Sequence, residues 1–373
     1  MSHKLWINTS LLKAPNQSIV KRYRIMSGTL TFCILIFIPL GLITGNSGSN
    51  NGTICATREA FRLCSHKSIL TEVNELRNEE RLQISDLGLL SIAAGAFKDL
   101  SITHLYLNQG NQISILTTDS FSGLPNLKWL HLDNNVVSLS SNLFEKLKSL
   151  VSLSLVYNRI NNIPARSFNG LTKLTFLYLN HNDITHISAN AFQGVSSNLM
   201  YLWLSNNQIN EIAPGAFAGL TQLNQLHLES NHLTSLQAGF SDGLINLEVL
   251  FLNDNQLTSL QQSTFTNLGN LQKLYLQNNN IASIESDSFV ALRKLEFLQL
   301  NGNHLTIIDN GAFYGLIALK ELHLSNNEIQ ELKKLVFKDL QALTSIHLNR
   351  TNLTDLDIEQ SGLPSSASVI STK

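Results

Sequence analysis

The side chains that could do chemistry in this chain recur at fixed spacing rather than gathering in a single motif. Aromatic and histidine residues stand between leucines in short L-x-L segments, as Tyr178 and Trp203 do, and each segment follows the previous one after 23–25 residues. A residue between two inward leucines of a strand points to the opposite face. We therefore expect one sheet face lined with aromatic rings, a surface that suits binding.

The predicted ligand-binding face consists of ten of these outward residues. They are Tyr106, Trp129, His131, Phe176, Tyr178, Tyr201, Trp203, His227, Phe251 and Tyr275. The centre of the face is almost without charge, and clustered apolar residues of this kind usually serve an interaction. Strand propensity alone would also favour aromatic residues. We predict a protein or peptide ligand, with a glycan as the alternative, because sugars also pack on aromatic rings.

Patterns typical of catalysis are missing from the sequence. It contains no G-x-x-x-x-G-K-[ST], H-E-x-x-H or G-x-S-x-G segment. Serine, histidine and aspartate recur with the repeat rather than as a triad. His323 and His347 occupy equivalent places in neighbouring units, but two histidines fall short of the three or four ligands that zinc takes. We therefore predict a protein that is not an enzyme, with no cofactor and no metal site.

The elements that position these residues are set by a lattice of asparagine and leucine. An L-x-x-L-x-L-x-x segment precedes nearly every asparagine of the lattice. These asparagines are Asn111, Asn135, Asn158, Asn182, Asn207, Asn231, Asn255, Asn279, Asn303 and Asn327. One unit cannot bury its apolar face alone, so the units must stack and their strands must form a parallel sheet. An asparagine carries both a donor and an acceptor, so a buried ladder of them can satisfy the backbone of each turn.

A second series of buried residues is expected behind the sheet. A phenylalanine stands nine or ten residues after each asparagine, from Phe121 to Phe337, and Phe97 holds the same place in an earlier unit. These rings should stack and fill the back of the core. Glycines that follow many of them, such as Gly123, should turn the chain towards the next strand.

The pattern resembles the extracellular leucine-rich-repeat proteins of animals, in the 24-residue type found in Toll-like receptor ectodomains. The resemblance covers residues 76–356, or about twelve units, with Leu87 and Thr351 in the asparagine places of the first and last. It implies an α/β, β-dominated leucine-rich-repeat solenoid, a curved horseshoe with the parallel sheet on its concave face. One solenoid therefore replaces the two or three globular domains that the length of 373 residues alone would suggest.

The amino-terminal residues predict export from the cytoplasm. Residues 1–24 form a basic leader, 25–45 form an apolar segment, and 46–53 form a glycine-rich linker. The small residues after the apolar segment favour a cleaved signal peptide, whereas its length and positive flank favour a membrane anchor. We favour cleavage, and both topologies place the repeats outside the cytoplasm, at the cell surface or secreted.

The two ends of the array need covers. Residues 54–75 are the predicted amino-terminal cap, in which Cys55 and Cys64 should form a disulfide because the protein is exported. The family's usual cap has four cysteines. Residues 357–373 form a polar carboxy-terminal tail without cysteine. Three explanations stay open for the last unit: the tail folds over it, another chain covers it, or the sequence continues further.

Glycosylation sequons flank the predicted binding face without interrupting it. The candidate sites are Asn51, Asn349 and Asn352, and no N-x-[ST] sequon lies between residues 54 and 348. Glycans would therefore leave the aromatic centre open.

The charge balance also limits the class of partner. The first 45 residues carry five basic and no acidic side chains, which leaves 21 basic against 27 acidic residues, or −6, beyond them. A nucleic acid ligand would need a basic excess, so we predict none. The sequence favours a non-catalytic recognition protein that binds a protein ligand on its concave face. The alternative is a structural, matrix or adhesion protein that forms homodimers or larger assemblies through the same face.

Overall fold

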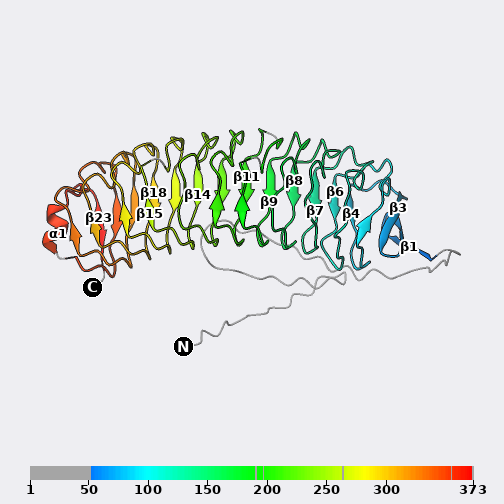
Figure 1. Cartoon of the computed structure of the whole chain (residues 1–373), viewed down its shortest axis with the longest axis horizontal. Helices are drawn as coiled ribbons and strands as arrows, with labels where there is room; N and C mark the ends of the chain where they lie inside the picture. Colours follow the sequence, from blue (N-terminus) through cyan, green and yellow to red (C-terminus); the bar gives the residue numbers. More distant parts are fainter. Residues whose placement is uncertain (1–51, 190, 196, 263, 354, 372–373) are drawn as a thin grey trace, which may run out of the picture.

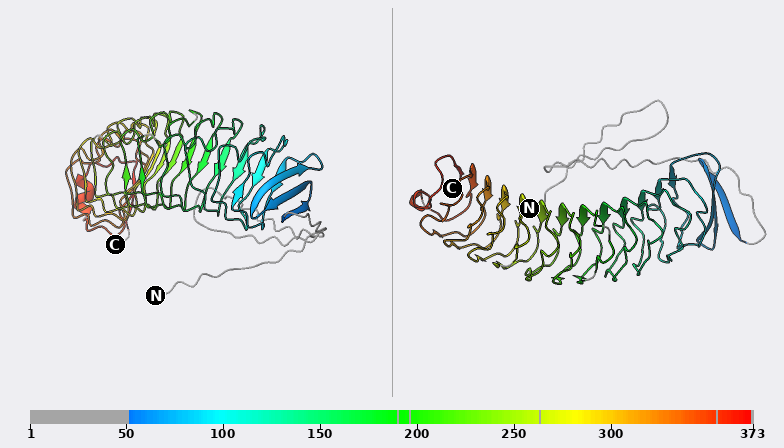
Figure 2. Two further views of the ribbon diagram at one scale, coloured as in Figure 1. Left: turned by 45° about the vertical axis from the view of Figure 1, so that its right-hand side comes forward. Right: turned by 90° about the horizontal axis from the view of Figure 1, so that it is seen from above.

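The computed structural model describes residues 52–371 except 190, 196, 263 and 354. They form one elongated, curved solenoid in which every turn contributes one short strand (Figure 1). The strands lie along the inner edge of the curve, and the irregular segments lie along its outer edge (Figure 2, right). The predicted fold class, a β-dominated leucine-rich-repeat solenoid with its sheet on the concave face, is confirmed.

The main sheet has thirteen strands, and its order follows the chain. The strands are β4 (Arg81–Gln83), β6 (His104–Tyr106), β7 (Trp129–His131), β8 (Ser152–Ser154), β9 (Phe176–Tyr178), β11 (Tyr201–Trp203), β13 (Gln225–His227), β14 (Val249–Phe251), β16 (Lys273–Tyr275), β18 (Phe297–Gln299), β20 (Glu321–His323), β22 (Ser345–His347) and β23 (Ser368–Ile370). All neighbouring pairs are parallel and in step, so that Trp203 lies beside Tyr178 and His227. Equivalent residues of successive units therefore form straight rows across the sheet.

Short two-residue strands on the far side of the turns pair between some units. They are β5 (Ser91–Ile92), β10 (His186–Ile187), β12 (Glu211–Ile212), β15 (Ser259–Leu260), β17 (Ser283–Ile284), β19 (Ile307–Ile308) and β21 (Glu331–Leu332). Pairing joins β10 to β12, β15 to β17 and β19 to β21. These pairs are all parallel, and they keep successive turns in register away from the main sheet.

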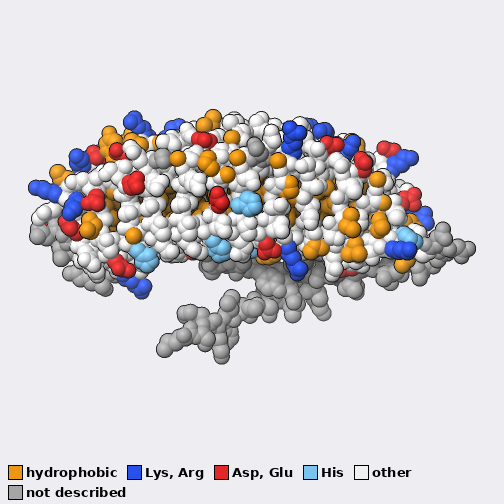
Figure 3. Space-filling model, in the orientation of Figure 1, with side chains coloured by type: hydrophobic (Ala, Val, Ile, Leu, Met, Phe, Trp, Pro, Cys, Tyr) orange, Lys and Arg blue, Asp and Glu red, His pale blue; other side chains and the backbone are white. Residues whose placement is uncertain are grey.

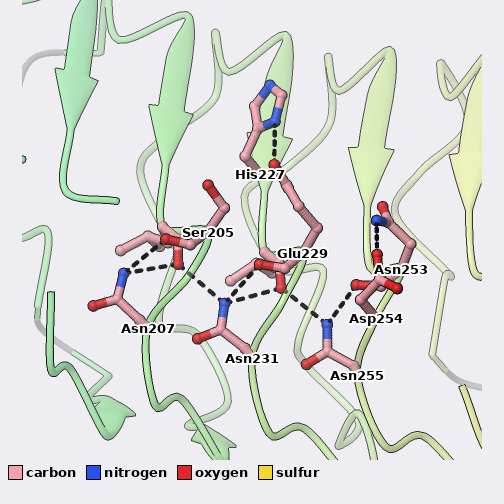
Figure 4. A network of polar contacts seen from close by, with 10 residues as sticks. Ser205, Asn207, His227, Glu229, Asn231, Asn253, Asp254 and Asn255 are labelled. Carbon is pink, nitrogen blue, oxygen red and sulfur yellow. Dashed lines mark hydrogen bonds and ion pairs between the residues drawn. The ribbon is translucent and has the colours of Figure 1, made fainter. Parts of the chain in front are cut away.

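The asparagine ladder binds backbone groups as the sequence predicts. Asn255 donates from Nδ2 to the carbonyl oxygens of Leu228 at 2.9 Å and Leu252 at 3.1 Å, and its Oδ1 accepts from the Leu233 N–H at 3.1 Å. The same arrangement repeats at Asn231 (Figure 4). Each side chain thus joins its own turn to the preceding one, which satisfies buried backbone groups that no strand pairing reaches.

The core lies between the sheet and a spine of phenylalanines. The middle leucine of a strand, such as Leu202, is completely buried, and Phe97 to Phe337 are at most 2% exposed. Most neighbouring rings of the spine stack with centroids about 6 Å apart, as Phe144 does on Phe168 at 6.4 Å. Gly123 adopts φ 89°, and a side chain there would collide with the carbonyl oxygen of Phe97. This glycine therefore lets one turn pack closely on the next.

The amino-terminal end is closed by an antiparallel sheet. Strands β1 (Thr53–Arg58), β2 (Phe61–His66) and β3 (Ile69–Glu75) pair in order, and β3 also pairs with β5. Cys55 and Cys64 lie opposite each other on β1 and β2 and form a disulfide. Phe61 and Leu70 are buried and continue the core of the repeats. The cap thus covers the open end of the first unit.

The carboxy-terminal residues add a further turn to the solenoid. Helix α1 (Asp355–Gln360) leads to β23, which pairs in parallel with β22 and ends the main sheet. Ser361 is fully buried, and its backbone carbonyl accepts from the Phe337 N–H at 2.9 Å. Of the three explanations for the last unit, the structure shows the tail folding over it. Val369, in the inward place of β23, is nevertheless 38% exposed because no further unit covers it among the described residues.

Candidate binding face

The concave face carries a continuous stack of aromatic rings, here called the concave ladder. It consists of Tyr178, Trp203, His227, Phe251 and Tyr275, one from each of β9, β11, β13, β14 and β16. Successive ring centroids lie 4.3, 5.2, 4.2 and 4.6 Å apart, and all four pairs are nearly parallel. The in-step parallel register sets this stack, because neighbouring strands lie about 4.8 Å apart.

Other predicted residues form shorter stacks on the same face. Phe176 stacks on Tyr201 with centroids 5.0 Å apart, beside the concave ladder. Towards the amino-terminal end Tyr106 stacks on His131 at 4.8 Å. Trp129 stacks on His104 with ring centroids 4.2 Å apart. His104 is therefore part of this stack, although it is not among the ten predicted ligand-binding residues. All ten predicted residues lie on strands of the main sheet and point out of the core.

Strand β8 separates the two groups of rings. Its outward residues, Ser152 and Ser154, are only 6% and 5% exposed. The Ser154 hydroxyl donates to the Asp133 carboxylate at the end of the neighbouring turn. Large rings on β7 and β9 flank these small side chains, so the surface here is covered although the residues face outward. The stacked rings on the two sides of β8 therefore form two separate groups rather than one continuous row.

Carboxylates beside the strands hold two of the histidine rings. Nδ1 of His227 lies 3.2 Å from Oε1 of Glu229 (Figure 4), and Nδ1 of His131 lies 3.5 Å from Oδ2 of Asp133. A carboxylate at Nδ1 favours a proton on that nitrogen and fixes the plane of the ring. These contacts keep the histidines parallel to the aromatic rings with which they stack.

Burial raises the pKa of two phenol groups of the concave face. Burial, and then the negative charge of Asp133, raises the pKa of Tyr178. Burial, and then Glu321, raises the pKa of Tyr275. Both phenols therefore remain hydrogen-bond donors across the physiological pH range.

A second series of rings, which the ten predicted ligand-binding residues did not include, continues the row towards the carboxy-terminal end. Phe297 lies 5.4 Å from Tyr275 and 5.3 Å from His323 in tilted arrangements, and His323 stacks on His347 at 4.0 Å. The three residues occupy outward places of β18, β20 and β22, as the repeat register predicts. The structure also brings Glu321 to this pair of histidines, with its Oε1 2.7 Å from Nε2 of His323.

Outside the strands of the main sheet, Tyr157 stacks on His181 with ring centroids 4.4 Å apart. The exterior seen in Figure 3 has apolar side chains scattered among polar and charged ones. A shallow depression of about 450 Å³, lined by residues that include Asp287, Tyr314 and Lys334, lies outside the strands of the main sheet. It mixes acidic and basic groups and contains no part of the concave ladder.

Two of the three predicted glycosylation sites are described by the structure. Asn349 is half-buried and follows β22, and Asn352 is exposed in the next turn. Asn51 lies outside the described residues, as do the leader and the apolar segment at 1–45. Within the described residues, no helix is long and apolar enough to span a membrane.

Comparison with known proteins identifies the repeat. The model of the family described as "Leucine rich repeat" matches residues 78–137, 133–184, 177–233, 222–281, 245–305, 298–353 and 317–365. These matches cover most of the chain. The chain belongs to the leucine-rich repeat family.

Known relatives agree with this assignment. Prolargin from Bos taurus is 42% identical to this leucine-rich repeat protein over 65 residues, which are 17% of each chain. Among solved structures, the TLR13 complex with ssRNA13 contains a chain that is 24% identical, with a TM-score of 0.61, over 81% of this chain and 48% of that one. The complex of Latrophilin 3, Unc5D and the FLRT2 leucine-rich repeats contains a chain that is 23% identical, with a TM-score of 0.61, over 83% of this chain and 91% of that one. At these identities the structural matches show the fold alone.

Proposed function

We propose that this leucine-rich repeat protein is a non-catalytic recognition protein that binds a protein or peptide ligand on its concave face. The observation that supports it most strongly is the concave ladder. Five rings stand in one ordered stack, and their outer edges are partly exposed on a surface with few charges. Rigid aromatic side chains lose little conformational entropy on binding and dominate the energetics of protein interfaces.

The stacking of the rings favours a protein over a glycan. A sugar ring packs flat on an aromatic face, but inside the ladder both faces of Trp203 are covered by Tyr178 and His227. What a ligand meets is a row of ring edges and the two phenol groups at Tyr178 and Tyr275. Edges and hydroxyls suit apolar side chains and backbone carbonyls of a peptide.

The same geometry argues against single-stranded nucleic acid. Bases stack on free aromatic faces and phosphates need a basic groove. Among the outward residues of the thirteen described strands, only Arg81 and Lys273 are basic. TLR13 was solved with an RNA, and FLRT2 in a complex with proteins. The few basic residues of this concave face favour a protein partner over an RNA.

We place the protein outside the cytoplasm, secreted or attached to the cell surface. The support is the basic leader followed by an apolar segment at residues 25–45, together with the disulfide between Cys55 and Cys64. Disulfides persist in oxidising compartments.

The test of the proposed function is a pair of matched double variants. Tyr178→Ala with Trp203→Ala removes the start of the concave ladder, whereas Tyr314→Ala with Ile317→Ala removes two side chains that are 49% and 55% exposed outside the sheet. Partners captured from native tissue by the wild-type chain are identified and purified, and their affinity for both variants is then measured. The ladder variant should bind at least about thirtyfold more weakly, because the loss of even one buried aromatic anchor costs about 2 kcal/mol or more.

Two results would count against the proposal. One is unchanged affinity of every partner for the ladder variant with a thermal transition like that of the wild type. The other is loss of binding in the Tyr314 and Ile317 variant instead. Sedimentation of the purified chain addresses self-association: concentration-dependent dimers that the ladder variant abolishes would support the structural or adhesion alternative.

A further inference from the structure

Three potential metal ligands meet on the concave face near the carboxy-terminal end of the sheet. Glu321 and His323 come from β20, and His347 comes from β22. Oε1 of Glu321 lies 2.7 Å from Nε2 of His323 and 3.7 Å from Nε2 of His347. All three ligand atoms lie within 4.8 Å of one another.

The fold places these atoms side by side without any special loop. The two histidines are paired residues on neighbouring parallel strands, and their rings stack with centroids 4.0 Å apart and planes inclined by 13°. Glu321 stands two residues before His323, so its side chain leaves the same face of the same strand. Both Nε2 atoms therefore lie beside the same carboxylate oxygen.

The separations are close to those of a coordinated ion. Ligand atoms about 2.1 Å from a tetrahedral Zn²⁺ are roughly 3.4 Å apart. The two separations between Glu321 and the histidines, 2.7 and 3.7 Å, lie on either side of that value. For both nitrogens to point at one ion, the two stacked imidazoles would have to rotate about their side-chain bonds.

Other histidine–carboxylate pairs in the described chain lack this arrangement. His131 with Asp133, and His304 with Glu328, each bring one histidine to one carboxylate. Among the described residues, Glu321 forms ion pairs with the two histidines and with no lysine or arginine. The partly exposed carboxylate offers a negatively charged oxygen ligand, and the two imidazoles offer nitrogen ligands. A divalent transition metal binds to ligands of both kinds.

We propose that Glu321, His323 and His347 form a Zn²⁺-binding site on the concave face. Two imidazoles and one carboxylate suit Zn²⁺ and other first-row transition metals better than Ca²⁺ or Mg²⁺, which prefer oxygen ligands. Three protein ligands leave a fourth coordination position open. That position faces the concave surface, since the side chains of Glu321, His323 and His347 are 40%, 18% and 23% exposed.

The test is titration calorimetry of the untagged chain with ZnCl₂ after removal of metal by a chelator. The wild type should bind one Zn²⁺ per chain in this site, and Ca²⁺ should give no heat. His323→Ala and His347→Ala should each weaken Zn²⁺ binding by at least about tenfold, because each removes one of three ligands. The matched control is His304→Ala, which removes an exposed histidine beside a single carboxylate and should leave the affinity unchanged.

A second measurement needs no variant and so avoids any loss of folding. In NMR spectra of the wild-type chain, Zn²⁺ should shift the imidazole signals of His323 and His347 at the first equivalent, and leave that of His304 in place. The proposal is overturned if the wild type binds no Zn²⁺, if His323→Ala binds it as tightly as the wild type, or if the first equivalent perturbs other histidines only. These experiments use the metal alone, so their outcome is separate from that of the protein-ligand proposal.

Discussion

Substitution of one ladder asparagine gives a prediction whose size follows from the hydrogen bonds that it removes. Asn231 is 3% exposed and accepts from the Ile209 N–H at 3.0 Å, while its Nδ2 donates to the carbonyl oxygens of Leu204 and Leu228 at 3.0 Å each. In Asn231→Ala the Ile209 N–H loses this partner inside the core, which costs about 1–3 kcal/mol.

The loss of the two hydrogen bonds to carbonyl oxygens costs less free energy, because each carbonyl keeps a hydrogen bond from another asparagine of the asparagine ladder. Asn207 still donates to Leu204 at 2.9 Å, and Asn255 still donates to Leu228 at 2.9 Å. Each lost bond then costs about 0.5–1.5 kcal/mol. The free energy of unfolding should fall by roughly 2–6 kcal/mol in total.

Equilibrium unfolding in urea measures this change against a neighbouring control. Asn210 is exposed in the preceding unit, next to Ile209, and Asn210→Ala should change the free energy of unfolding by no more than about 0.5 kcal/mol. If Asn231→Ala and Asn210→Ala differ by less than about 1 kcal/mol, water or a rearranged backbone replaces the side chain, and the asparagine ladder contributes little to the stability of the solenoid.

Three further predictions concern the cap, a histidine and the spine. Replacement of both Cys55 and Cys64 by serine should lower the free energy of unfolding of the cap by about 2–3 kcal/mol, because the disulfide closes a loop with a sequence separation of 9; unchanged hydrogen exchange in β1 to β3 would contradict this. Burial, followed by repulsion from Arg81, lowers the pKa of His104 in the folded protein. The neutral imidazole therefore contributes to stability fully above its ordinary pKa near 6.5. This contribution is lost as the pH falls through the lower pKa of the folded state. An NMR titration should give a pKa for His104 below that ordinary value, and Arg81→Gln should raise it; a wild-type pKa at or above the ordinary one would refute the argument. Phe168 is fully buried between two rings of the spine, so Phe168→Ala should cost about 3–5 kcal/mol in chemical unfolding, and a cost below about 1 kcal/mol would mean that the spine repacks.

The repeat allowed much of the fold to be predicted from the sequence. Each asparagine and each L-x-L segment fixes one place in a lattice, and parallel strands in step then determine which residues are neighbours. This is why the sequence alone predicts that Tyr178, Trp203 and His227 lie side by side on one face of the sheet. Their face-to-face stacking follows from the strand spacing, but it also needs the ring orientations that the structure shows.

Features that depend on side-chain conformation or break the repeat were not predictable. The burial of Ser154 depends on the large rings on either side and on the contact with Asp133. The approach of Glu321 to two histidines depends on its rotamer, since register places it only on the same face. Strand β23 lacks the leucine and asparagine signature of the repeat, so the sequence of residues 357–373 indicated a polar tail.

The most direct test of the proposed binding face is whether a bound ligand contacts the concave ladder. A photo-crosslinking amino acid in place of Gln225, which lies on β13 between Tyr201 and Val249, reports on the concave face. The same amino acid in place of Ile317 reports on the outer surface. We predict that a captured partner crosslinks at position 225 and not at position 317. Crosslinking at position 317 alone, with the partner bound, would contradict binding on the concave face.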